Sequence, residues 1–64
     1  MPKLSLSLED LVEEVLSKNP GKILEYHAGV QASFEFLVNE VLRLSGGRAD
    51  PAKVRALLLS KLLR

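Results

Sequence analysis

The 64-residue chain has no cysteine and no tryptophan, and its aromatic residues are Tyr26, Phe34 and Phe36. Without cysteine it can form neither a disulfide framework nor a thiolate metal site. So few aromatic residues argue against a β-sandwich, because strands are enriched in aromatic and β-branched side chains. No apolar run approaches the ~20 residues of a membrane span, and the segment from Leu4 to Leu8 alternates with serine, unlike the apolar core of a signal peptide. We therefore expect a cytoplasmic protein without a membrane partner.

Leucine dominates what is present. Hydrophobic residues make up 47% of the chain and charged residues 27%. This length accommodates one small domain, so we treat residues 1–64 as a single unit. A domain of this size buries only about 60% of the surface that its unfolded chain exposes. Close packing, a partner, or both must therefore supply its stability.

Start and stop signals divide the chain into four predicted helices. Ser7, followed three residues later by Asp10, resembles a capping box. Asn19-Pro20 and Asp50-Pro51 each place a capping side chain before a proline, which favours the first turn of a helix. The signals predict helices over residues 8–17, 20–28, 30–44 and 51–63. The predicted fold is all-α, a small helical bundle of three main helices plus one short helix.

Two of the predicted helices carry more apolar surface than a single stripe. The helix over residues 30–44 is apolar over more than half its circumference, which predicts a central helix with Leu37 and Val41 in the core. The helix over residues 51–63 has one stripe at Val54, Leu57, Leu58 and Leu62, and a second that a small core does not need. We expect the second stripe and the off-stripe Phe36 to support a homo-oligomer, with these self-association candidates: Phe36, Ala52, Ala56, Leu59 and Leu63.

The sequence offers no catalytic constellation and no metal site. The single histidine, His27, has no serine or acid placed beside it by any pattern, whereas nucleophilic catalysis needs a nucleophile, a base and an orienting group. The acidic run over residues 9–14 is most simply a solvated helix face. Gly46-Gly47-Arg48 lacks the spacing and the lysine of a phosphate-binding P-loop. We therefore predict that the chain is not an enzyme and holds no cofactor.

The charges are unevenly distributed although the formal net charge is only +1. Residues 1–40 contain three Lys/Arg and seven Asp/Glu, and residues 41–64 contain six Lys/Arg and one Asp. This asymmetry indicates either a basic face or internal complementarity between an acidic and a basic helix. Arg43, Arg48 and Lys53 bracket the Gly46-Gly47 turn, where a phosphate could meet basic side chains and a helix N-terminus.

Three segments, in matching order and spacing from about Leu11 to Leu63, resemble the C-terminal end of the GatB/YqeY tail domain. They are the run Asn19-Pro20-Gly21-Lys22-Ile23-Leu24-Glu25-Tyr26-His27-Ala28-Gly29, the helix Phe36-Leu37-Val38-Asn39-Glu40-Val41-Leu42, and the turn Gly46-Gly47-Arg48-Ala49-Asp50-Pro51 followed by Val54, Leu57 and Leu58. The resemblance implies an all-helical module appended to the GatB subunit of the tRNA-dependent amidotransferase and to some glutaminyl-tRNA synthetases. It also implies that catalysis lies in other domains and that this module touches the outer corner of tRNA.

The resemblance implies four RNA-binding candidates, at the positions of this chain that match the family pattern. Lys53, which lies near the Gly46-Gly47 turn, is the fifth candidate. The candidates are Lys22, His27, Arg43, Arg48 and Lys53. Val30 and Ala32 stand where the family pattern has basic residues, and the loss of those residues weakens the expected phosphate contact. Asn39 stands where the pattern has glycine. Two hypotheses follow. The first is a non-catalytic tRNA-binding module with the parent amidotransferase subunits as partners. The second is a protein–protein or self-association module that kept the scaffold without RNA binding.

Overall fold

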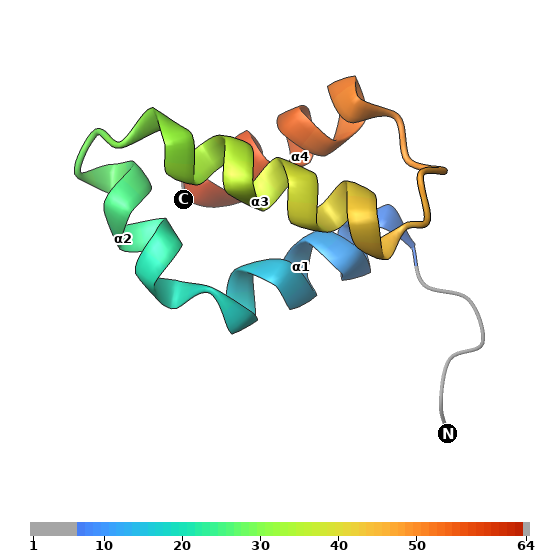
Figure 1. Ribbon diagram of the computed structural model, residues 1–64, viewed down its shortest axis with the longest axis horizontal. Helices are drawn as coiled ribbons and strands as arrows, with labels where there is room; N and C mark the ends of the chain where they lie inside the picture. Colours follow the sequence, from blue (N-terminus) through green and yellow to red (C-terminus); the bar gives the residue numbers. More distant parts are fainter. Residues whose placement is uncertain (1–6, 64) are drawn as a thin grey trace.

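The computed structural model describes residues 7–63, which form four helices and no strand (Figure 1). They are α1 (Leu8–Lys18), α2 (Pro20–His27), α3 (Gln31–Leu44) and α4 (Pro51–Leu62). The predicted all-α bundle of three longer helices and one short helix is confirmed. The start of the chain, which bears on the signal-peptide question, lies outside the described residues. Within residues 7–63, no helix combines the length and the apolar character needed to cross a membrane.

Each observed helix differs from its predicted range by one residue, because the capping residues decide where a helix ends. The helix predicted over residues 8–17 continues through Lys18. The other three differences are residues predicted as helical that the structure makes caps: Ala28, Val30 and Leu63. At the start of α1 the predicted capping box forms, since Ser7 Oγ accepts a hydrogen bond from the Asp10 amide at 3.2 Å.

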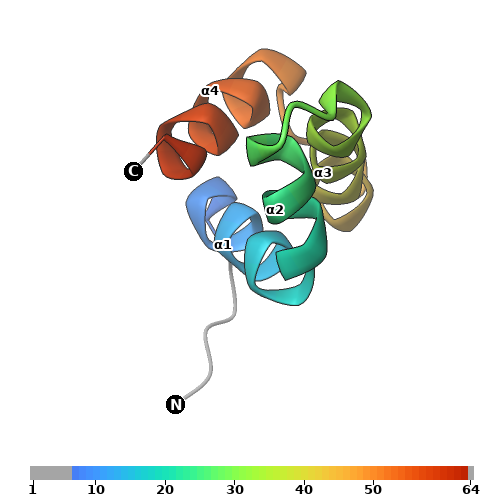
Figure 2. The same ribbon diagram turned by 90° about the vertical axis from the view of Figure 1, so that its left-hand side faces the viewer.

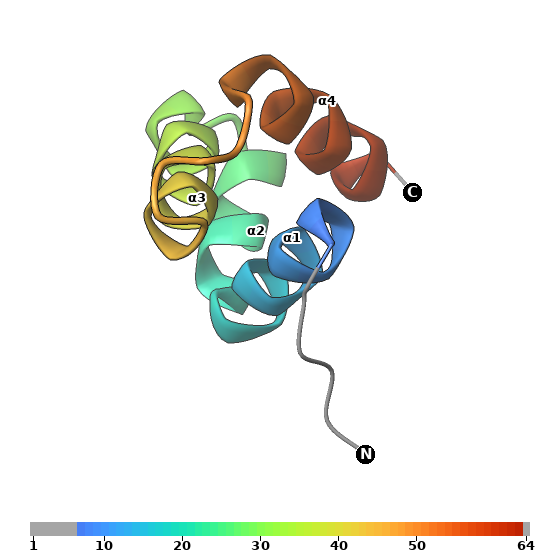
Figure 3. The same ribbon diagram turned by 90° about the vertical axis from the view of Figure 1, so that its right-hand side faces the viewer.

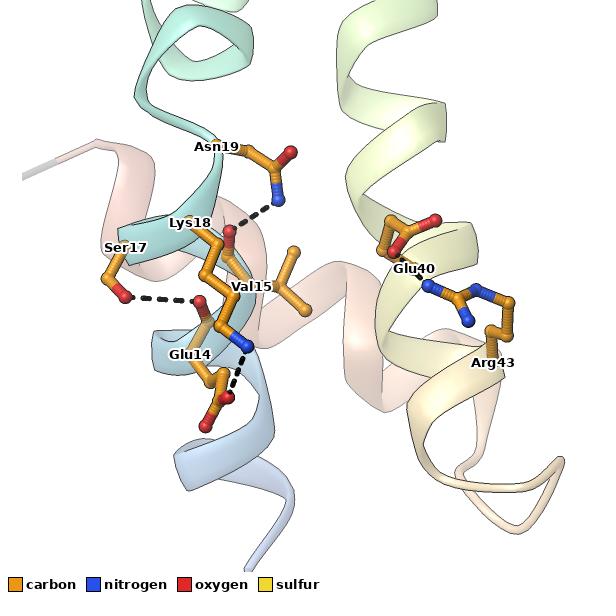
Figure 4. Close-up of polar contacts among 7 residues, drawn as sticks. All are labelled: Glu14, Val15, Ser17, Lys18, Asn19, Glu40 and Arg43. Carbon is orange, nitrogen blue, oxygen red and sulfur yellow. Dashed lines mark hydrogen bonds and ion pairs between the residues drawn. The ribbon is translucent and has the colours of Figure 1, made fainter.

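Asn19 has a different role from the one that the sequence indicates. The Asn19-Pro20 pair predicts a side-chain cap for α2, but no such hydrogen bond forms. Instead the Asn19 side chain donates to the Val15 carbonyl oxygen at 2.8 Å, at the end of α1 (Figure 4). Asn19 therefore closes the preceding helix, and proline alone favours the start of α2.

α3 is the central helix, as its broad apolar face predicts. Figures 2 and 3, which view the two ends of the long axis, show α1, α3 and α4 around a common centre, with α2 nearer the end seen in Figure 2. Leu37 and Val41 of α3 are fully buried. Burial of one such side chain contributes roughly 1.5–3 kcal/mol. The core consists of Val12, Val15, Phe34, Leu37, Val38, Val41, Val54, Leu58 and Leu62.

Ion pairs connect α4 to the two long helices beside it. Arg55 Nη1 and Nη2 donate to the two carboxylate oxygens of Glu35 on α3 at 2.6 and 2.8 Å. Lys61 Nζ lies 2.8 Å from Glu13 and 3.5 Å from Glu9 on α1. The acidic first helix and the basic last helix therefore pair within the chain, and internal complementarity accounts for part of the charge asymmetry.

Candidate functional site

The turn between α3 and α4 is held in a fixed shape by its own hydrogen bonds. Gly46 and Gly47 adopt φ values of 70° and 80°, a region that glycine enters without strain. The Gly47 amide donates to the Leu42 carbonyl oxygen at 3.1 Å. Ser45 Oγ donates to the same carbonyl at 2.8 Å and accepts from the Ala49 amide at 3.2 Å. The turn therefore presents the side chain of Arg48 from an ordered backbone.

Two cationic side chains at this turn have no carboxylate partner. Within residues 7–63, Arg48 and Lys53 are exposed and make no ion pair, whereas the other five Lys and Arg side chains do. Arg43, in the last turn of α3, lies 2.7 Å from Glu40 (Figure 4). The hydrogen bond to Glu40 raises the pKa of Arg43. The turn thus carries two unpaired cations and one cation shared with a neighbouring carboxylate.

The N-terminus of α4 is already occupied by an acidic side chain. Asp50 is the N-cap residue, and its Oδ1 accepts a hydrogen bond from the Ala52 amide at 2.9 Å. A carboxylate at this position satisfies the free amide and complements the helix dipole. A phosphate at the helix N-terminus would compete with it. Anion contact at the turn must therefore come mainly from the side chains of Arg48, Lys53 and Arg43.

Lys22 and His27 lie away from this turn and make contacts within the fold. The Lys22 amine lies 4.9 Å from the centre of the Phe36 ring and 3.5 Å from Glu25. The His27 ring nitrogen Nε2 lies 2.8 Å from the carbonyl oxygen of Leu62, in the last turn of α4. Three of the five RNA-binding candidates thus flank or lie in the turn between α3 and α4, and these two lie on α2.

The five self-association candidates also lie in two separate places. Four of them lie along the outer face of α4 and are exposed, and they are Ala52, Ala56, Leu59 and Leu63. Leu59 is 39% exposed and Leu63 76%. Phe36 is 37% exposed, but it lies on α3 beneath the Lys22 amine and does not continue the strip on α4.

Other polar groups in the described part of the chain hold helices together. Ser33 is buried, and its hydroxyl donates to Glu25 Oε1 at 2.6 Å. This hydrogen bond, with the nearby charge of Lys22, lowers the pKa of Glu25. Among residues 7–63, no three His, Cys, Asp or Glu side chains gather as a metal-ligand set.

Sequence reasoning did not find the long-range polar pairs. Arg55 pairs with Glu35, 20 positions earlier, and Lys61 with Glu13, 48 positions earlier. The signal that could have indicated them is the position of Arg55 and Lys61 on opposite flanks of the apolar stripe of α4. This position indicates that Arg55 and Lys61 each face a neighbouring helix, but it does not indicate which carboxylate each side chain contacts.

Comparison with known proteins gives a consistent result. The B subunit of an aspartyl/glutamyl-tRNA(Asn/Gln) amidotransferase from Geobacter sp. (strain M21) is 43% identical over 88% of this chain. The same subunits from Halorhodospira halophila and Methanothermobacter thermautotrophicus are 41% and 37% identical over 88% and 80% of it. The chain spans about 12% of the length of the first two relatives. No solved structure matches it. The GatB domain family matches residues 4–62, so this chain belongs to that family.

Proposed function

We propose that this chain is a non-catalytic accessory module that contacts tRNA. The observation that carries the proposal is a pair of unpaired cations, Arg48 in the turn between α3 and α4 and Lys53 in the first turn of α4. The phosphates of RNA are suitable partners for them, and neutralising phosphates releases bound counterions. The name of the relatives, which specifies tRNA(Asn/Gln), supports tRNA as the nucleic acid.

We expect weak binding through contacts to the RNA phosphates rather than to the bases. Arg48 and Lys53 supply two phosphate contacts, and Arg43 supplies a third when a phosphate replaces Glu40 as its partner. Contacts to phosphate position a protein without reading sequence. Three such contacts predict a slope of about −2 to −3 in a plot of log affinity against log salt concentration.

A module of this kind contributes binding while the chemistry takes place elsewhere. The chain covers about an eighth of the length of its relatives, so the remaining subunits and domains of a tRNA-dependent amidotransferase are the proposed partners. Such a partnership places the chain in the cytoplasm with its tRNA.

A titration of fluorescently labelled tRNA by the chain, at several salt concentrations, tests the proposal. Arg48→Glu and Lys53→Glu should each weaken binding and make the salt slope shallower by about one unit. Lys18→Glu is the matched control, because it reverses one charge that is paired with Glu14 on α1 (Figure 4). The control should bind like the parent. Absence of tRNA binding by the parent at low salt would contradict the proposal.

Self-association is a second candidate function. The exposure of Leu59 and Leu63 on the outer face of α4 favours it, since apolar side chains gathered on a surface usually mark an interface.

A further inference from the structure

The outer face of α4 has the spacing of a helix–helix seam. Ala52, Ala56, Leu59 and Leu63 follow one another at intervals of four, three and four residues. This alternation is the a/d repeat of a coiled coil, in which each apolar side chain enters a hole on the facing helix. All four residues are exposed, while the opposite stripe of α4, with Val54, Leu58 and Leu62, fills the core.

We propose that this seam pairs two copies of the chain, α4 against α4 in antiparallel orientation about a two-fold axis. The proposal goes beyond RNA contact and gives the self-association candidate a geometry. The observation that selects a second copy is that the seam is complementary to itself. The two-fold axis crosses the seam at the height along α4 midway between Leu57 and Leu58. Ala52 then faces Leu63 of the second copy, and Ala56 faces Leu59 of the second copy. A two-fold contact requires this reciprocity.

Side-chain volume selects the antiparallel orientation. Antiparallel pairing places each leucine of the seam opposite an alanine of the other copy, so large and small side chains interdigitate. Parallel pairing would place leucine against leucine at one end and alanine against alanine at the other, and the helix axes would splay. Arg55 flanks the seam, and its charge is already paired with Glu35 of its own chain.

Further exposed apolar side chains lie at the end of the molecule beside Leu63. The contact of His27 with the Leu62 carbonyl places the C-terminal end of α2 against the last turn of α4. Figure 2 shows these two helix ends and the start of α3 on the same side of the molecule. Leu24 on α2 is 71% exposed, and Val30 at the start of α3 is 43% exposed. Four of the six large apolar side chains that are exposed within residues 7–63 thus belong to elements that meet at this end.

The size of the surface sets the strength of the contact. A stable dimer buries about 800 Å² on each partner, whereas an apolar patch on a monomer covers a few hundred Å². We therefore expect a weak dimer that is populated at tens to hundreds of micromolar and dissociates on dilution.

Sedimentation equilibrium over about 10–500 µM tests the association. The expected mass rises with concentration from 7.1 kDa toward twice that value. Leu59→Glu should raise the dissociation constant at least about tenfold, because two buried leucines are lost per dimer. Leu44→Glu is the matched control, since Leu44 is 45% exposed at the far end of α3, and it should associate like the parent. A mass of 7.1 kDa throughout would overturn the proposal.

Disulfide trapping tests the orientation in a chain that has no native cysteine. Ala52→Cys combined with Leu63→Cys should give a covalent dimer on oxidation, because the two cysteines meet across the axis. They cannot bridge within one helix, where 11 residues separate them by about 16 Å. Ala52→Cys alone should remain uncrosslinked. Efficient crosslinking by the single variant would show parallel pairing and overturn the geometry.

The two proposals fail separately. A chain that stays monomeric but binds tRNA overturns the dimer and leaves RNA contact standing. A chain that dimerises without binding tRNA overturns the proposed RNA contact and leaves the dimer standing. Far-UV circular dichroism of Leu59→Glu should match the parent, so that loss of association is not loss of folding. If that variant is unfolded, Ala56→Glu, at an exposed alanine of the same seam, should give the same dissociation.

Discussion

The two ends of the molecule differ in the chemistry that they offer. At one end lie Arg48, in the turn between α3 and α4, and Lys53, in the first turn of α4, which have no acidic partner within residues 7–63. At the other end α2, the start of α3 and the last turns of α4 expose Leu24, Val30, Leu59 and Leu63. Along a long axis of 36 Å, one small core thus presents a basic end and an apolar end. The difference teaches that so thin a core can still carry two binding surfaces of different chemistry, although the seam on α4 begins at Ala52, beside the basic turn.

The separation depends on the helices that join the two ends. α3 runs from the apolar end to the basic turn, and α4 returns (Figure 1). The ion pairs of Arg55 and Lys61 fix α4 against α3 and α1. A change in the core should therefore damage both ends together, while a change at either end should damage only that end.

The largest effect is expected from Leu37→Ala. Leu37 is fully buried at the centre of α3, and large-to-small changes at such sites cost about 2–5 kcal/mol. Thermal and urea unfolding followed by circular dichroism would measure the loss. Both ends should lose their function in proportion to the unfolded fraction. A melting temperature equal to that of the parent would mean that α3 is not the centre of the fold.

A smaller effect, confined to the basic end, is expected from alanine at Gly46 or Gly47. Both glycines have positive φ and open space around the position of a Cβ. The cost is therefore backbone strain alone, about 1–2 kcal/mol for each. Gly21→Ala is the matched control, because Gly21 lies within α2 with equally open space and without positive φ. Urea unfolding should show Gly21→Ala to be as stable as the parent or more so.

Acid should weaken the helix contacts made by carboxylates. The hydrogen bonds from Arg55 lower the pKa of Glu35, and the hydrogen bond from Ser33 lowers that of Glu25, both from an ordinary value of 4.5. The unfolded chain therefore binds more protons than the folded chain in this range, and stability is lost as the pH falls below about 4.5 through the lowered values. Urea unfolding across that range should show the loss. Glu35→Gln should make the decline shallower, and an unchanged decline would contradict the assignment.

Base should act on Lys61 in the opposite sense. The hydrogen bond to Glu13 raises the pKa of Lys61 above its ordinary value of 10.5. Its contribution is therefore complete below that value and is lost as the pH rises through the raised value. Urea unfolding of Lys61→Met should show less decline above about pH 10.5 than the parent does. Equal declines would mean that the contact between α1 and α4 does not depend on this charge.

The sequence predicted the elements better than the contacts between them. Caps and apolar periodicity located the four helices to within one residue at each end, because these signals are local. The pairing of Arg55 with Glu35 and of Lys61 with Glu13 depends on how the helices pack, so no local pattern indicates it.

The candidate sites show the same limit. The unpaired Arg48 and Lys53 were named from their position at the turn, but only the structure separates them from Lys22 and His27. Leu24 and Val30 were not named as interaction residues. Ile23 and Tyr26 pack against the core, and Leu24 lies on the other side of α2. A helix of eight residues is too short for its apolar pattern to show clearly which side faces the core.

The smallest effect on stability, and the largest on function, is expected from reversing the charges at the basic turn. Arg48→Glu and Lys53→Glu change exposed side chains without ion pairs, so each should alter the free energy of unfolding by no more than about 0.5 kcal/mol. Urea unfolding checks this expectation. A larger loss of unfolding free energy would mean that these side chains stabilise the turn and are not available to bind a partner.

The most direct test of two independent ends is one tRNA titration, measured by fluorescence anisotropy, of three forms of the chain. The forms are the parent, the double variant Arg48→Glu/Lys53→Glu, and Leu59→Glu. At protein concentrations below those of dimer formation, the parent and Leu59→Glu should bind tRNA equally, and the double variant should bind more weakly, with a salt slope shallower by about two units. Equal binding by all three forms, or loss of binding by Leu59→Glu to the same extent as by the double variant, would contradict the account.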